Sequence, residues 1–272
     1  MMSYTATPSD GSAWVTGASS GIGRALALDL ARAGFAVYAT ARSKDALADL
    51  EGLSDGLEGR IIAAPGDVTE TESMAEIAAH IDAEGGGLAL AVFNAGVYLP
   101  VHGETLKVAD FDARFAVNLS GVVNGLVPTI DRMKARGRGQ IAIVSSVTGY
   151  GGMPTSAAYG ATKAALINMA ESLKFDLDKI GIRIQVINPG FVDTPATQDN
   201  AFAMPALLQP EDASRRIAKG LKSASFEVTF PRRFTYVLKL LQCLPYPAYF
   251  ALMNAATGWK RRPLETGGDQ PE

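Results

Sequence analysis

The chain has 272 residues, of which 47% are hydrophobic and 19% charged, an ordinary globular composition that suits one α/β unit with a large core. A formal net charge of -3 gives no basic field for nucleic acid. The single cysteine, Cys243, cannot form an internal disulfide, and His80 and His102 lack metal-ligand spacing. We therefore expect a reduced, cytoplasmic protein that binds neither a metal nor nucleic acid.

Residues 1–10 lack the basic segment and apolar core of a secretory signal, so we expect a loose N-terminal tail. Beyond them, short apolar runs alternate with longer segments of helical period, which predicts βαβ units and a parallel sheet. The predicted strands are Ala13 to Thr16, Ala36 to Thr40, Ile61 to Ala64, Leu88 to Phe93, Gln140 to Val144 and Arg183 to Ile187. Because these runs are almost continuously apolar, helices should cover both faces of the sheet, giving a doubly wound α/β fold.

A glycine-rich turn follows the first predicted strand and opens a helix. It reads Thr16-Gly17-Ala18-Ser19-Ser20-Gly21-Ile22-Gly23. Its glycines permit close approach of the backbone, and the start of the helix offers free N–H groups to a pyrophosphate. We assign Gly17, Ser19, Ser20, Gly21, Ile22 and Gly23 to cofactor binding, although such a turn can also serve tight strand-to-helix packing.

The end of the second strand bears on the choice between NADP and NAD. There Arg42 follows Ala41, and no carboxylate occurs until Asp45. An acidic residue at this place commonly binds the ribose hydroxyls of NAD, whereas an arginine accommodates the phosphate of NADP. We predict NADP(H) over NAD(H), with a solvated Arg42 as the alternative. After the third strand, Asp67 and Val68 either receive the adenine or cap the next helix.

Tyr159 and Lys163 form a candidate proton-transfer pair. Residues four apart share one face of a helix, so the two side chains should be neighbours. A free phenol has a pKa of about 10, and an adjacent lysine cation stabilises the phenolate, so that the tyrosine can act as general acid or base. The pair by itself occurs by chance in many helices.

Four other motifs occur in the chain together with this pair. They are Asn94-Ala95-Gly96 after the fourth strand, Asn118 within a helix, serines 145 and 146 after the fifth strand, and Asn188-Pro189-Gly190 after the sixth. With them the chain resembles the short-chain dehydrogenase/reductase family over residues of about 11 to 225. The resemblance implies a Rossmann fold with strand order 3-2-1-4-5-6-7 and a catalytic tetrad of Asn118, Ser146, Tyr159 and Lys163.

The resemblance also assigns a role to each member of the tetrad. Tyr159 protonates the carbonyl oxygen and Ser146 polarises it, while Ser145 is the strand-end neighbour. Lys163 lowers the pKa of the tyrosine and holds the nicotinamide ribose, and Asn118 keeps a water in the proton relay.

The same resemblance implies further cofactor contacts. Asn94, Ala95 and Gly96 shape the adenosine side, and Pro189, Gly190, Val192 and Thr194 surround the nicotinamide. Loops 97–106 and 195–210 should border the substrate, and the apolar run Ala201 to Leu208 suggests a hydrophobic carbonyl or alcohol. Helices at 107–135 and 155–179 would form a homodimer or homotetramer.

The end of the chain differs in composition. We divide the chain into a catalytic domain at 11–230, an apolar and basic helical extension at 231–262, and a tail at 263–272. Lys239, Gln242 and two prolines interrupt the apolar run, so it is a poor spanning segment. The extension is interpreted as a lid over the substrate or a subunit contact; the alternative is a peripheral contact with the inner face of a membrane.

Taken together, these features predict an NADP(H)-dependent oxidoreductase that interconverts a carbonyl and a secondary alcohol. Two alternatives stay open: a non-catalytic NADP-binding sensor or membrane-tethered scaffold, and a sugar-nucleotide epimerase or dehydratase. The complete tetrad argues against the first. Against the second, the glycine spacing differs from those enzymes, and no larger C-terminal substrate domain is present.

Overall fold

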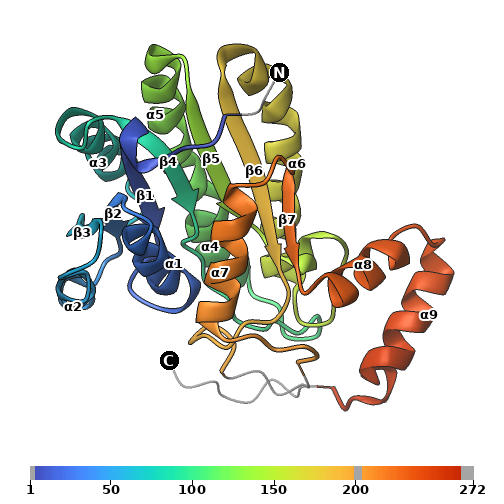
Figure 1. The fold of residues 1–272 in the computed structure, drawn as a ribbon. Helices are drawn as coiled ribbons and strands as arrows, with labels where there is room; N and C mark the ends of the chain where they lie inside the picture. The colour runs from blue at the N-terminus through green and yellow to red at the C-terminus, as the bar shows by residue number, and fades with distance from the viewer. Residues whose placement is uncertain (1–3, 199–203, 265–272) are drawn as a thin grey trace.

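A seven-stranded parallel sheet forms the centre of the molecule (Figure 1). The computed structural model describes residues 4–198 and 204–264. The strand order is β3-β2-β1-β4-β5-β6-β7, which confirms the predicted doubly wound fold. The strands are β1 Ser12–Thr16, β2 Ala36–Thr40, β3 Arg60–Ala63, β4 Leu88–Phe93, β5 Gly139–Val144, β6 Ile182–Pro189 and β7 Glu227–Phe230.

The first six strands lie where the apolar runs predict them, whereas no apolar run marks the seventh. β7 has only four residues, Glu-Val-Thr-Phe, and alternates polar with apolar side chains at the edge of the sheet. A short edge strand of this kind carries little hydrophobic signal of its own. Its pairing with β6, in which Val186 lies opposite Glu227, is what makes it a strand.

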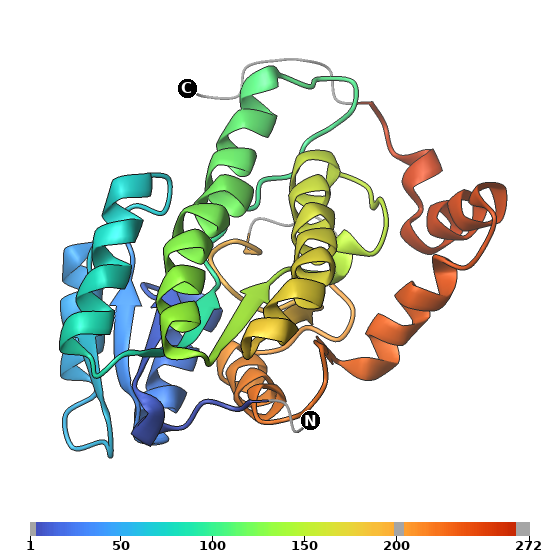
Figure 2. The same cartoon turned by 90° about the horizontal axis from the view of Figure 1, so that it is seen from above.

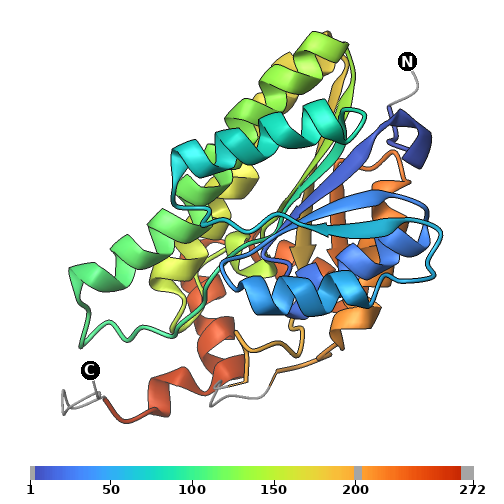
Figure 3. The same cartoon turned by 90° about the vertical axis from the view of Figure 1, so that its left-hand side faces the viewer.

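Helices cover both faces of the sheet, as Figure 3 shows from the β3 edge. One face carries α1 Gly21–Arg32, α2 Lys44–Gly52 and α7 Pro210–Leu221. The other carries α3 Thr71–Glu84, α5 Gly121–Arg136 and α6 Ala157–Leu177, which lie side by side in Figure 2. β4 and β5 are buried along their whole length because side chains on both faces meet a helix layer.

The helical segment expected at 107–135 is interrupted. It consists of α4 Val108–Phe115, a π-helical turn Ala116–Ser120 and then α5. Such wide turns within helices frequently occur at functional sites. The turn contains Asn118, which is fully buried.

The C-terminal extension follows β7 directly and projects beyond that edge of the sheet (Figure 1). It comprises α8 Arg232–Leu241, α9 Tyr246–Thr257 and a 3-10 turn Trp259–Arg261. Within the described ranges, no helix is both long and apolar enough to cross a bilayer.

Candidate active site

The glycine-rich turn between β1 and α1 brings the backbone unusually close to the next loop. Gly17 and Gly21 have positive φ angles of 67° and 54°. A Cβ on Gly17 would lie 2.7 Å from the Ala95 Cα, and one on Gly23 would lie 2.3 Å from the Gly17 carbonyl oxygen. A side chain is thus excluded at Gly17 and at Gly23, while the first turn of α1 contains no acidic residue. These features fit a bound pyrophosphate at the helix start.

Asn94 holds this turn against the end of β4. Its amide Nδ2 donates to the carbonyl oxygens of Thr16 and Gly17 at 3.1 and 3.3 Å. In return, the Thr16 hydroxyl accepts the backbone N–H groups of Asn94 and Ala95 at 3.0 and 3.2 Å. The carboxyl ends of β1 and β4 are therefore joined, and Asn94 acts on the shape of the cleft through the backbone.

Arg42 and Asp67 lie within electrostatic reach of each other at the ends of β2 and β3. The Asp67 Oδ1 accepts hydrogen bonds from the amide and hydroxyl of Thr69 at 3.0 and 2.9 Å. These bonds, together with the positive charge of Arg42, hold the pKa of Asp67 below its ordinary value. Asp67 thus orders the turn that precedes α3, and the exposed Arg42 presents a cation where the cofactor ribose is expected.

Val68, next to Asp67, is held in place by α5. Its carbonyl oxygen accepts a hydrogen bond from Asn124 at 2.9 Å, and its side chain lies against Gly121. The backbone after β3 is therefore positioned by an element far away in sequence.

Tyr159 lies near Ser146 and against a second aromatic ring. Burial raises the pKa of the Tyr159 phenol to about 12, a hydrogen bond with Ser146 opposes that rise, and nearby Tyr98 adds to it. The rings of Tyr98 and Tyr159 meet edge to face, with their centroids 5.0 Å apart. Ser146 accepts the Thr148 amide at 3.2 Å, which fixes the short turn after β5. The tyrosine is thus protonated at neutral pH and placed beside a hydroxyl.

Lys163 is buried one helical turn from Tyr159. Its ammonium lies 5.4 Å from the centre of the tyrosine ring and donates to the Val144 carbonyl oxygen at 2.9 Å. Burial lowers the pKa of Lys163 to about 8. Ser145, the serine next to Ser146, has a structural hydrogen bond, since its hydroxyl donates to the Lys163 carbonyl oxygen at 2.7 Å. Ser145 therefore fastens β5 to α6.

Asn118 connects three parts of the site. Its Oδ1 accepts the Val97 amide at 2.7 Å, and its Nδ2 donates to the Val97 carbonyl at 2.9 Å and to the Thr162 hydroxyl at 3.2 Å. Gly96 lies between this side chain and the lysine, because a Cβ there would be 3.4 Å from Asn118 Oδ1 and 3.5 Å from Lys163 Nζ. The structure thus gathers all four tetrad residues into one region.

The segment after β6 crosses over the glycine turn. Gly190 donates to the Phe230 carbonyl at 2.8 Å, and Val192 pairs with Leu208. Thr194 reaches α1, since a Cβ on Gly21 would lie 2.9 Å from its methyl group. Thr194 therefore lies against the start of α1. Part of the expected substrate loop, Ala201 to Ala203, lies outside the described residues.

The C-terminal extension contacts both loops that flank Tyr159. The Tyr249 hydroxyl of α9 donates to the Gly152 carbonyl at 2.6 Å, in the loop before α6. Trp259 stacks on His102 with centroids 5.9 Å apart, and Arg262 pairs with Glu104, both in loop 97–106. One side of the extension therefore packs against the loop before α6 and against loop 97–106.

Several residues of this site carry no signal in the sequence. Tyr98 reaches Tyr159 only through the fold, and Thr155, whose hydroxyl lies 3.3 Å from the Tyr98 hydroxyl, has a positive φ of 59°. Thr162 supports Asn118 from α6. Thr16 begins the glycine-rich turn and Thr162 lies between Tyr159 and Lys163, so these two positions could have been singled out from the motifs.

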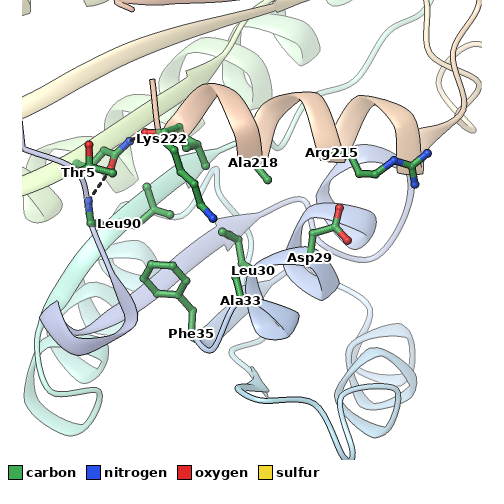
Figure 4. A pocket seen from close by; sticks show the side chains of 12 residues that line it. Thr5, Asp29, Leu30, Ala33, Phe35, Leu90, Arg215, Ala218 and Lys222 are labelled. Atoms are coloured by element: carbon green, nitrogen blue, oxygen red, sulfur yellow. Dashed lines mark hydrogen bonds between the residues drawn. The ribbon is translucent and has the colours of Figure 1, made fainter. Parts of the chain in front are cut away.

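Two cavities are lined by none of the four tetrad residues. One, of about 240 Å³, lies between the N-terminal segment, α1 and α7, where Phe35 and Leu30 face Lys222 (Figure 4). It is lined by Gln140, from the amino end of β5, and so lies at the opposite edge of the sheet from the glycine turn. The other, of about 430 Å³, adjoins Tyr150 and Glu227. In the described part of the chain, no group of three metal-ligating side chains is present.

Comparison with known proteins agrees with this geometry. The family model described as short chain dehydrogenase matches residues 12–203. An uncharacterized oxidoreductase of Myxococcus xanthus is 37% identical over 242 residues, covering 88% of this chain and 94% of the relative. The chain belongs to the short-chain dehydrogenase family, and its predicted membership is confirmed.

Two further relatives have named activities. A 3-oxoacyl-(acyl-carrier-protein) reductase FabG of Thermotoga maritima is 34% identical over 184 residues, covering 68% of this chain and 75% of the relative. An acetoacetyl-CoA reductase of Synechocystis sp. is 36% identical over 183 residues, covering 67% and 72%. The chain is thus an oxidoreductase of this family.

Solved structures share the fold. A short-chain dehydrogenase from Burkholderia phymatum in complex with NAD has a TM-score of 0.78 at 22% identity and covers 86% of this chain and 94% of its own. ElxO with NADP bound has a TM-score of 0.73 at 24% identity and covers 81% and 97%. Structural neighbours of this chain thus include complexes with either nicotinamide dinucleotide.

Proposed function

We propose that the chain is an NADP(H)-dependent reductase that converts a hydrophobic ketone to its secondary alcohol, with Tyr159 as the general acid. The observation that carries this proposal is the group formed by Tyr159, Ser146 and Lys163 at the carboxyl edge of the sheet. The Lys163 ammonium lies 5.4 Å from the tyrosine ring, and the Ser146 side chain is close enough to oppose the rise in the pKa of the tyrosine. Ligands of open α/β sheets bind at this edge.

The protonation states favour reduction. With a pKa of about 12, Tyr159 holds its proton at neutral pH and can donate it to a carbonyl oxygen. Lys163, with a pKa of about 8, is charged at neutral pH and stabilises the phenolate that remains. In this proposal the Ser146 hydroxyl donates to the same carbonyl oxygen. A nicotinamide dinucleotide held at the glycine-rich turn and beside Lys163 would supply the hydride.

NADP(H) is proposed because Arg42 supplies an exposed cation just after β2, where we expect the ribose phosphate to bind. The Asp67 carboxylate, which interacts electrostatically with Arg42, already accepts hydrogen bonds from Thr69. An arginine suits the doubly charged phosphate, whereas binding of ribose hydroxyls would call for a carboxylate.

A hydrophobic ketone is proposed from the apolar residues around the entrance. Leu99 and Leu207, on the two loops that border it, are 57% and 40% exposed. The reductases of Thermotoga maritima and Synechocystis sp. carry the names of enzymes for 3-oxoacyl and acetoacetyl groups, which supports a ketone next to an acyl function. A panel of ketones of increasing chain length measures this preference; turnover of small polar ketones alone would contradict it.

We also propose that the chain forms a homodimer or homotetramer through its α4, α5 and α6 face. Val108, Val127 and Phe175 on these helices are 78%, 55% and 77% exposed. Exposed apolar residues gathered on one face commonly mark an interface. Light scattering after size-exclusion chromatography would show a dimer or tetramer, and a monomer at micromolar concentration would refute the proposal.

The variant Tyr159→Phe tests the central proposal. It removes only the acidic hydroxyl, so turnover of any ketone substrate should fall by at least about 100-fold, the usual contribution of a general acid. NADPH binding, followed by the fluorescence of the reduced nicotinamide, should change little. Tyr236→Phe is the matched control, since Tyr236 is 54% exposed on α8. Unchanged turnover in Tyr159→Phe would remove Tyr159 from the mechanism.

A further inference from the structure

The C-terminal extension carries a charge opposite to that of the whole chain. Residues 231–264 include six lysines and arginines and no carboxylate, whereas the net charge of the chain is -3. Two of the six are paired: Lys239 with Glu227 and Arg262 with Glu104. The other four are exposed and form no ion pair with any described residue; they are Arg232, Arg233, Lys260 and Arg261.

The outer side of the extension is also apolar. α9 contains no charged side chain, and Tyr249 is its one buried residue. Tyr246 and Phe250, four residues apart on one face of the helix, are 77% and 56% exposed. A helix of this composition on the surface of a soluble protein marks a contact with an apolar partner.

α8 shows the same division between two sides. Thr235 and Leu238 are buried, while Tyr236, Val237 and Leu240 are 54%, 56% and 69% exposed. Its exposed side therefore begins with Arg232 and Arg233 and continues with aromatic and aliphatic groups, a pattern typical of helices that lie in a membrane interface.

The length of α9 and the charge of the extension indicate what kind of surface covers its exposed apolar side. α9 has 12 residues and so extends about 18 Å, well short of the roughly 30 Å hydrocarbon core of a bilayer. A second copy packed on the same surface by twofold symmetry would bring the four unpaired cations toward four more. An anionic lipid surface instead supplies both apolar depth and negative charge.

We propose that the outer side of α8 and α9 docks flat on an anionic phospholipid membrane. Arg232 and Arg233 at one end, and Lys260 and Arg261 at the other, contact the headgroups, while Tyr246, Phe250 and Leu240 enter the interface. The inner side of the same extension contacts both loops beside Tyr159. Docking thus places the entrance near the bilayer, where a lipophilic ketone would be concentrated; this consequence rests on the proposed function.

The full chain is tested by sedimentation with vesicles of phosphatidylcholine alone and of equal parts phosphatidylcholine and phosphatidylglycerol. Binding is expected to the anionic vesicles only and is expected to fall as salt rises. Because each cation near such a surface adds roughly fivefold to binding, Arg232→Gln with Arg233→Gln should weaken it roughly 30-fold. Phe250→Ser should weaken it as well.

Matched control variants remove the same kinds of side chain, two cations or one apolar group, from parts of the surface outside the extension. Arg216→Gln with Lys219→Gln removes two exposed cations from α7, and Leu53→Ser removes an apolar side chain that is 51% exposed at the end of α2. Both controls should bind vesicles like the unaltered chain. Binding of NADPH, which uses none of these residues, reports that every variant is folded and is independent of the vesicle result.

Three results would overturn the proposal. The first is no binding of the full chain to anionic vesicles. The second is an equal loss of binding in the control variants, which would indicate unspecific adsorption. The third is a halved particle mass of Phe250→Ser in analytical ultracentrifugation, which would show that a second copy covers the surface. None of them bears on Tyr159, whose test is turnover.

Discussion

Removal of the Lys163 ammonium should change how the stability of the protein depends on pH. Burial lowers the pKa of this group from its ordinary value of 10.5 to about 8 in the folded protein. Between these two values the unfolded chain holds more protons, so a rise in pH favours the folded state. Each pH unit contributes about 1.4 kcal/mol, so that from pH 7 to about pH 9.5 Lys163 adds about 2 kcal/mol to the free energy of unfolding.

The variant Lys163→Met lacks this contribution. Urea unfolding of the cofactor-free protein, followed through the emission of the fully buried Trp14, measures the free energy at both pH values. The unaltered chain should gain about 2 kcal/mol relative to the variant between them. Lys174→Met is the control on the same helix, since its side chain is 40% exposed in an ion pair with Asp178. Equal pH slopes for the unaltered chain and Lys163→Met would refute the assigned effect of burial.

Three further predictions concern the cofactor turn and the extension. Arg42→Ala should raise the KM for NADPH roughly tenfold and leave the KM for NADH nearly unchanged. The control variant Arg32→Ala should alter neither KM. If Arg42→Ala changed both KM values equally, Arg42 would not recognise the phosphate. Gly23→Ala places a Cβ 2.3 Å from the Gly17 carbonyl oxygen and should lower the free energy of unfolding by about 1–3 kcal/mol. Gly52→Ala, where no atom lies within 4 Å of the added Cβ, is the control, and thermal melts compare the two variants. Burial raises the pKa of Glu227, but hydrogen bonds from Lys239, Tyr150 and Asn188 bring it below its ordinary 4.5, so the stability that this carboxylate contributes is lost as pH falls below that value. The variant Glu227→Gln lacks the titrating group and should flatten the acid side of a plot of Tm against pH. An unchanged acid side in the variant would contradict the network.

The hydrogen-bond network around Glu227 joins residues whose contact could not be predicted from the sequence. Glu227 accepts the Tyr150 hydroxyl at 2.5 Å and the Asn188 amide at 2.7 Å, and it pairs with Lys239. It therefore ties the turn after Ser146 to β6, β7 and α8. No spacing in the sequence relates residues 150, 188, 227 and 239, because they meet only once β6 and β7 have paired.

The same distinction applies to the tetrad. Tyr159 and Lys163 could be paired from the sequence because four residues make one turn of a helix. Placing Asn118 beside Val97 and Thr162 required the π-helical turn, which propensities do not predict. Tyr98, which reaches Tyr159 from a loop, gave no local signal at all.

The sequence by itself indicated the parallel sheet, the glycine turn and the spacing of the catalytic pair, since these depend on apolar period and on short-range geometry, whereas the strand order was implied by the resemblance to the family. The sequence left open whether the C-terminal extension is a lid, a subunit contact or a membrane contact, because composition does not tell which side of a helix is buried. Tertiary structure decided which side that is. Tyr249 and Trp259 pack on the loops beside Tyr159, whereas Tyr246, Phe250 and Leu240 remain exposed, because a helix at the β7 edge has the protein on one side only.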